Sequence, residues 1–179
     1  MRQRLMMAVV GLIVPLAAQA AEPVHEVTYF SGSTMVRLQD GRNVVASDSW
    51  VCRTVDQASN TITEQLITID HRPNVPAREF IVTFHVTEDG TFTMQERKKA
   101  FVGAGYLQGP AWHWTAWHSL SLLPDGAYVD SKDQRVSDGL MIEKLWCDAF
   151  GHSSVSMSEQ LKPVTAAEFQ AKRRQVLPD

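Results

Sequence analysis

Three ionisable residues lie on the apolar side of alternating segments, where a side chain could do chemistry: His118, Glu96 and Glu159. Alternate residues of a β-strand point to the same face, so each of these would point inward with its hydrophobic neighbours. A charge in an apolar interior is costly unless it is paired or used, which makes these residues candidates for a functional site. In an enzyme, His118 and a carboxylate from Glu96 or Glu159 would form an acid–base pair, because histidine titrates near neutral pH.

The same residues could instead fix the polar end of a bound molecule whose body lies against apolar side chains. The residues expected to line such a ligand site are Trp112, Trp114, His118, Phe84, Met94, Glu96 and Tyr106. Two simpler interpretations stay open. The ionisable side chains could lie at wet strand ends, and Trp112 and Trp114 could be core residues, since large aromatic side chains dominate the core of a small domain.

A tryptophan-rich segment, residues 109–126, is the centre of the predicted fold. At a period of two, Trp112, Trp114 and His118 share one face, which predicts a long half-buried strand. Asp125-Gly126 then predicts a tight hairpin turn, because both residues tolerate the positive φ that such a turn needs.

Alternation and turns recur along the rest of the chain. Residues 80–86 and 91–97, joined by Asp89-Gly90, form the clearest hairpin. Gly103 and Gly105 indicate a bend or a bulge in the strand that follows. About eight to ten strands joined by tight turns predict an all-β antiparallel meander, which closes into a barrel because closure removes exposed strand edges.

One helix is expected after these strands. Thr165 and Glu168 form a capping box, in which the Thr165 side chain bonds the backbone amide of Glu168 and the Glu168 side chain bonds the backbone amide of Thr165. The predicted helix covers about residues 165–177. The turn-punctuated meander, the stretch Gly105–Trp117 and this closing helix together resemble the lipocalin-like, or calycin-type, up-and-down β-barrel proteins of the bacterial envelope. The resemblance covers residues 25–177 and implies a cup-shaped barrel that holds a small apolar ligand.

The first twenty residues have the three parts of a secretory signal peptide: Arg2 and Arg4, an apolar run, and a small-residue cleavage site near Ala20/Ala21. They predict a periplasmic or secreted protein whose remaining residues, 21–179, form a single domain.

Two cysteines, Cys52 and Cys147, follow the signal peptide. An exported chain with an even number of cysteines favours one disulfide between them. The alternative is a pair of buried free thiols on strands.

The sequence lacks the residues that several classes of function require. Acidic residues outnumber basic ones by 20 to 17, and no basic stripe is present, so a nucleic-acid partner is not expected. No segment after the signal peptide is apolar and long enough for stable membrane insertion. The six histidines lack metal-ligand spacing, and no cofactor motif or serine-hydrolase motif occurs.

We therefore expect an exported soluble protein that binds a small apolar or amphipathic molecule in a β-barrel cavity, without a metal or other cofactor. Two alternatives remain: a small isomerase or hydrolase that uses the inward histidine and carboxylates, and an interaction module with an envelope protein partner and a barrel filled by its own side chains.

Overall fold

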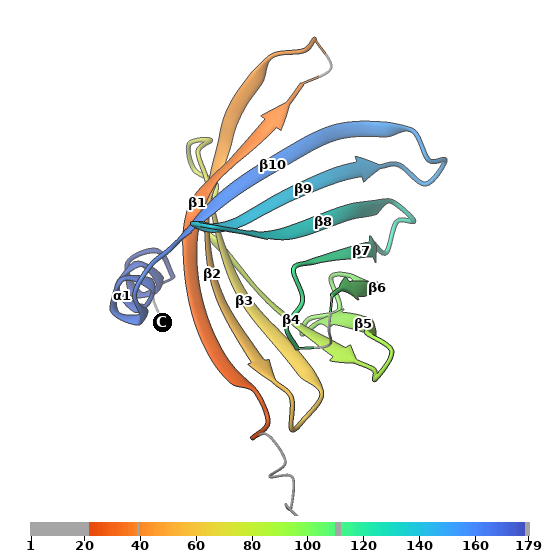
Figure 1. Cartoon of the computed structure of the whole chain (residues 1–179). Coiled ribbons are helices and arrows are strands. Elements are labelled where there is room, and N and C mark those ends of the chain that lie inside the picture. The colour runs from red at the N-terminus through yellow and green to blue at the C-terminus, as the bar shows by residue number, and fades with distance from the viewer. Residues whose placement is uncertain (1–21, 39, 110–111, 178–179) are drawn as a thin grey trace, which may run out of the picture.

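The computed structural model describes residues 22–38, 40–109 and 112–177. Within them, ten antiparallel strands precede one short helix (Figure 1), which confirms the predicted all-β meander. The strands are β1 (His25–Arg37), β2 (Asn43–Asp56), β3 (Thr61–Asp70), β4 (Arg78–Val86), β5 (Thr91–Glu96), β6 (Val102–Gln108), β7 (Ala116–Leu122), β8 (Tyr128–Val136), β9 (Gly139–Cys147) and β10 (Ser153–Pro163), and the helix is α1 (Ala166–Val176). The predicted signal peptide and its cleavage site lie outside the described residues.

The sheet closes on itself. Each strand pairs with its neighbours in sequence, and β1 also pairs with β10. Phe30 of β1, for example, lies between Val51 on β2 and Pro163 on β10. The turns that follow β1, β3, β5, β7 and β9 gather at one end of the barrel, which we call the mouth, and those that follow β2, β4, β6 and β8 gather at the other end, the base.

The base is packed with hydrophobic side chains. Phe84, Phe92 and Trp117 form an aromatic group there, with ring centroids 5.0 to 6.0 Å apart. The buried members of this cluster are Val55, Ile62, Val82, Phe84, Val86, Phe92, Met94, Leu107, Trp114 and Trp117, and Val24, Phe101 and Trp112 pack against it. This cluster closes the barrel at one end only, because most of its members come from β3–β7 and the turns of the base.

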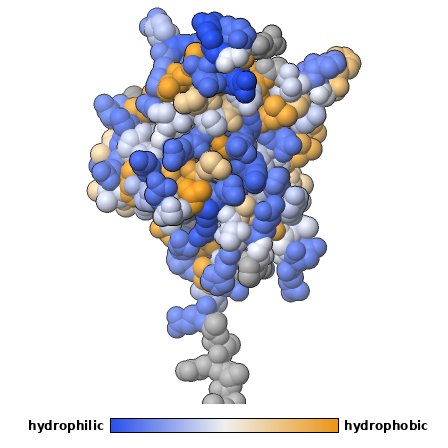
Figure 2. All heavy atoms as spheres, turned by 45° about the horizontal axis from the view of Figure 1, so that its top comes forward, coloured by the Kyte–Doolittle hydropathy of each residue, from blue (hydrophilic) through white to orange (hydrophobic). Residues whose placement is uncertain are grey.

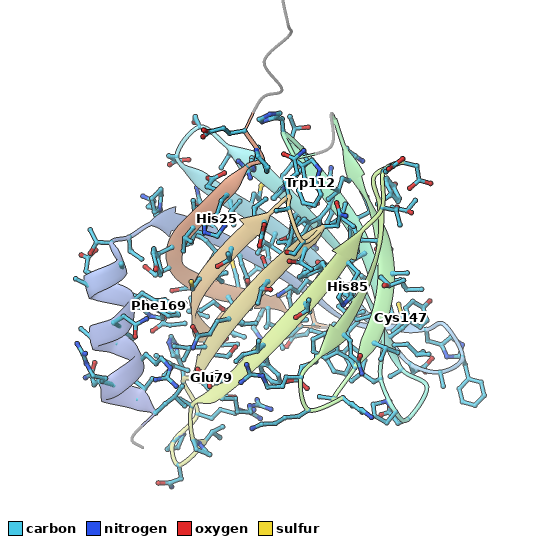
Figure 3. The ribbon with its side chains drawn as sticks, turned by 90° about the horizontal axis from the view of Figure 1, so that it is seen from below. His25, Glu79, His85, Trp112, Cys147 and Phe169 are labelled. Carbon is cyan, nitrogen blue, oxygen red and sulfur yellow. The ribbon has the colours of Figure 1, made fainter. Side chains whose placement is uncertain are left out.

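Helix α1 lies outside the barrel, against β1 and β2 (Figures 1 and 3). Its capping box is present as predicted, with Thr165 accepting a hydrogen bond from the Glu168 amide and Glu168 accepting one from the Thr165 amide. Phe169 is fully buried and its ring lies 5.5 Å from that of Tyr29. Among the described residues, no helix is long and apolar enough to cross a membrane.

The tryptophan-rich strand begins later than the sequence predicts. Residues 112–115 form a turn in which Trp112 has a φ of 69°, and β7 starts only at Ala116. The alternation therefore does not run continuously from Trp112 to His118. A shift of one residue moves every side chain of a strand to the other face, so Trp117 points inward and His118 outward. The expected inward position of His118 is wrong.

Tyr106, like His118, points away from the barrel interior. The two residues face each other across β6 and β7, and their rings stack on the outer surface at 5.3 Å. Tyr106 therefore does not line the interior, contrary to its expected role. Other hydrophobic side chains also reach the surface, but on the face shown in Figure 2 they are scattered among hydrophilic ones.

The expected disulfide is absent, and Cys52 and Cys147 are free. Cys52 lies on β2 opposite Tyr29 of β1. The next residue of β1, Phe30, pairs with Pro163 at one end of β10. Cys147 pairs with Ser153, at the other end of β10. Ten residues of strand separate these ends by about 33 Å, whereas a disulfide needs Cα atoms about 4.4 to 6.8 Å apart.

Candidate ligand-binding site

Two adjoining cavities, which share part of their lining, occupy the barrel between its mouth and its packed base. The outer one, the mouth cavity, has a volume of about 450 Å³ and is lined mainly by apolar residues that include Leu66, Phe80, Phe101, Leu123, Val129, Trp146 and Met157. The inner one, the chamber, has a volume of about 120 Å³. Leu66, Phe101, Ser121, Val129, Lys144 and Glu159 line both cavities, so a molecule entering at the mouth would reach the chamber past these residues.

The chamber has an apolar wall and a polar wall. Strands β2 to β5 contribute apolar side chains, among them Val51, Leu66, Val82, Phe84 and Met94. Strands β7 to β10 contribute most of the polar ones, which are Ser119, Ser121, Ser131, Asp133, Lys144 and Glu159, together with three apolar residues, Trp117, Val129 and Ile142. Arg53 and Glu64 add two charges from β2 and β3. The division suits a molecule with one polar and one apolar part.

Arg53 is the hub of the deep charges. It is 1% exposed, and its Nη2 lies 2.5 Å from Glu64 Oε1 and 3.1 Å from Asp133 Oδ2. The guanidinium carbon also lies 4.3 Å from the ring centroid of Trp117 and 5.0 Å from that of Trp114. A buried cation is costly unless several partners compensate it, and here two carboxylates and two aromatic faces do so.

A second ion pair lies nearer the mouth. Lys144 Nζ donates to Glu159 Oε1 at 3.2 Å, and the Thr34 hydroxyl donates to the same oxygen at 3.0 Å. Burial alone would lower the pKa of Lys144, but the negative charges of Glu159 and Asp133 outweigh it and raise that pKa. Lys144 therefore keeps its positive charge inside the barrel.

The Asp133 carboxyl, which pairs with Arg53, has a strongly raised pKa. Burial raises its pKa to about 6, against the opposing effect of Arg53, and the charges of Glu64 and Glu159 raise it further. Its Oδ1 accepts a hydrogen bond from Ser131 at 3.3 Å. A carboxyl with this pKa changes charge in a range where an ordinary aspartate stays ionised.

Two polar atoms of these charged side chains have no hydrogen-bond partner among the residues that the structure describes. They are Arg53 Nη1, a donor, and Glu159 Oε2, an acceptor. Glu159 is only 6% exposed and lines both cavities. Buried polar groups are nearly always paired, so an unpaired one beside a cavity marks a place where water or a ligand completes the bonding.

Glycines make room for this interior. A Cβ at Gly105 would collide with the His118 carbonyl oxygen and the Phe92 ring, and one at Gly103 would collide with the Leu120 carbonyl oxygen and the end of Met94. Phe92 and Met94 can therefore lie directly against β6. The pairing of β6 with β5 and with β7 runs through both glycines without a shift in register, so the bulge that was one expectation for them is not present.

The structure brings some of the predicted site residues to the cavities. Phe84 and Met94 line the chamber, and Glu159 lines both cavities. Trp114 and Trp112 line neither the chamber nor the mouth cavity, contrary to their expected role. Trp114 is a buried member of the base cluster that stacks on Trp117 at 4.6 Å, and Trp112 packs against the same cluster (Figure 3).

Other predicted residues lie elsewhere. Glu96 is buried, as expected, but its Oε2 accepts from the Lys98 and Ala100 amides in the β5–β6 turn, so it holds that turn and does not line the chamber or the mouth cavity. His118 is outside the barrel and cannot pair with either carboxylate. The inward histidine–carboxylate pair is therefore wrong.

Four charged residues of the site were missed in the sequence: Arg53, Glu64, Asp133 and Lys144. Glu64 lies between Ile62 and Leu66 on one face of β3. Arg53 lies between Val51 and Val55 on one strand face, and Lys144 follows Leu140 and Ile142 in the same way. This alternation is the signal that pointed to Glu159, and it could have found Glu64, Arg53 and Lys144. Asp133 stands between Ser131 and Arg135, where no apolar pattern marks the inward face. Among the described residues, no group of three potential metal ligands comes together.

Known families and proteins provide no further guidance to this site. No protein-family model matches the sequence, and no curated protein sequence matches it either.

Proposed function

We propose that the chain is an exported, lipocalin-like binding protein that holds one small amphipathic molecule inside its barrel. The observation that carries this proposal is the two-part interior, in which an apolar mouth cavity leads to a chamber with a charged wall and an unpaired Glu159 oxygen. A polar head group would lie in the chamber and an apolar body in the mouth cavity. The volumes, about 120 and 450 Å³, suit a ligand of small-molecule size.

Two features support a binding role over the alternatives. A barrel filled by its own side chains would contain no cavities between the base cluster and the mouth. The acid–base pair considered for an enzyme cannot form inside the barrel, because its histidine, His118, stacks on Tyr106 on the outer surface.

Native mass spectrometry of gently purified protein tests this function. We expect a mass above that of the bare chain, and extraction of the bound compound followed by chromatography and mass spectrometry should give an amphipathic molecule. A chain that keeps its bare mass even after incubation with a lipid extract would contradict the proposal.

A blocking variant makes the test specific to the cavity. Ser121 lines both cavities, so Ser121→Phe should close the passage between them and abolish the excess mass. Leu120→Phe, on the outer face of the same strand, adds a ring where the side chain is exposed and should retain the ligand. Equal loading of the two variants would locate the bound molecule outside the barrel.

A further inference from the structure

The charge balance of the chamber narrows the chemistry of the ligand. Two cationic side chains, Arg53 and Lys144, line the chamber, together with three carboxyl side chains, Glu64, Asp133 and Glu159. With all of them ionised, the chamber has one more negative than positive charge. An anionic head group would add a fourth negative charge to this group, whereas a cationic one would balance it.

The unpaired oxygen shows where that positive charge would be received. Glu159 Oε1 accepts hydrogen bonds from Lys144 and Thr34, but Oε2 has no partner in the described part of the chain. The side chain is more than nine-tenths buried and stands where the two cavities meet. An ammonium group has only donors and no acceptor, so it matches an unpaired carboxylate oxygen.

The three serines of the chamber fit the same head group, whereas the unpaired Arg53 Nη1 is a donor that an ammonium group would leave to water. Ser119, Ser121 and Ser131 carry hydroxyl groups along β7 and β8 that can accept further ammonium hydrogens. Arg78 is the other charged residue of the mouth cavity, and it lies at the exposed start of β4, outside the chamber. The apolar mouth cavity, which lies between Arg78 and the chamber, would surround the hydrocarbon body of the ligand.

We propose that the chamber selects a cationic amphiphile, a molecule with a primary ammonium head group and an apolar body, with Glu159 Oε2 as its main anchor. This inference rests on the proposed binding function and adds the class of ligand. The chamber is small, so the head group would be a compact one. A fatty acid of the same chain length would be a poor ligand, because its carboxylate would lie beside three others.

Three probes that differ only in the head group test this selectivity: decylammonium, decanol and decanoate. Each is titrated into the full-length mature protein at pH 8 by isothermal calorimetry, below the concentration at which it forms micelles. We expect decylammonium to bind at least about tenfold more tightly than decanoate, with decanol between them. Decanoate binding as tightly as decylammonium, or more tightly, would overturn the inference and leave the binding function intact. Failure of all three probes to bind would overturn both.

A matched pair of variants assigns the anchor. Glu159→Gln should reduce the preference for decylammonium over decanol to about twofold or less, because the unpaired oxygen loses its charge. Glu143→Gln removes the same charge from the exposed outer face of β9 and should leave the preference unchanged. Preference that survives Glu159→Gln would overturn the assignment of Glu159. If Glu159→Gln does not fold, the three-probe comparison on the unmodified protein still decides the selectivity.

Discussion

Asp133 shows how the buried charges connect the binding site to stability. Its pKa in the folded chain is about 6, above the ordinary value near 3.9, because burial disfavours the carboxylate. Folding therefore favours the protonated form. The stability from this group is fully present below about pH 4 and is lost as the pH rises through 6, at up to about 1.4 kcal/mol per pH unit.

Asp133→Asn should remove this dependence. We expect the free energy of unfolding of the variant, relative to that of the unmodified protein, to rise by roughly 2 to 3 kcal/mol between pH 4 and pH 7. Urea unfolding followed by tryptophan fluorescence across this range measures the difference. Asp130→Asn, on the exposed outer face of β8, is the control and should show no such rise. A constant difference between Asp133→Asn and the unmodified protein would refute the shifted pKa.

Individual residues were predictable where the strand alternation around them is strong. Glu159 lies between Met157 and Leu161, and its inward position follows from that pattern alone. His118 was misplaced because the alternation of aromatic residues continues in the sequence through a turn. Tryptophan rarely adopts a positive φ, so nothing in the sequence marks the turn at Trp112. The Arg53 and Asp133 contacts join residues 80 positions apart, and only the closed barrel brings them together.

At the scale of elements, the helix was the most predictable feature. A capping box is a local device, so Thr165 and Glu168 locate the helix start without knowledge of the rest of the fold. Its docking site was not predictable. Phe169 packs on Tyr29, and Arg173 pairs with Glu79 at 3.0 Å, contacts that depend on how the barrel curves.

Phe169 should provide most of the energy that holds α1 to the barrel. Its ring is fully buried, whereas the neighbouring Gln170 is exposed. We expect Phe169→Ala to lower the free energy of unfolding by about 3 to 5 kcal/mol, and Gln170→Ala to change it by less than about 0.5 kcal/mol. Denaturant unfolding monitored by circular dichroism gives both values. A loss below about 1 kcal/mol in Phe169→Ala would mean that the helix contributes little to the stability of the barrel.

At the scale of the whole molecule, the barrel follows from many short-range signals acting together. Turn residues make successive strands antiparallel, alternation gives each strand an inner and an outer face, and closure satisfies the two strands that would otherwise be edges. The cavity does not follow from these signals. Whether the inside of a closed sheet is filled depends on the sum of all inward side chains. In this barrel the buried rings of Phe84, Phe92, Trp114 and Trp117 fill the base, and space remains toward the mouth.

The same closed topology decides the state of the cysteines, whatever compartment the protein occupies. Cys52 lies on β2 and Cys147 on β9, and strands β1 and β10 separate them. The two cysteines are also level with opposite ends of β10. No local movement could bring their sulfur atoms into bonding distance. We expect protein unfolded in denaturant without reductant to react with two equivalents of an alkylating reagent, as counted by mass spectrometry, and Cys147→Ser to react with one. Reduction beforehand should change neither number. Unreduced protein that takes up no label would show that the chain pairs its cysteines, and it would require strands in an order different from the one described.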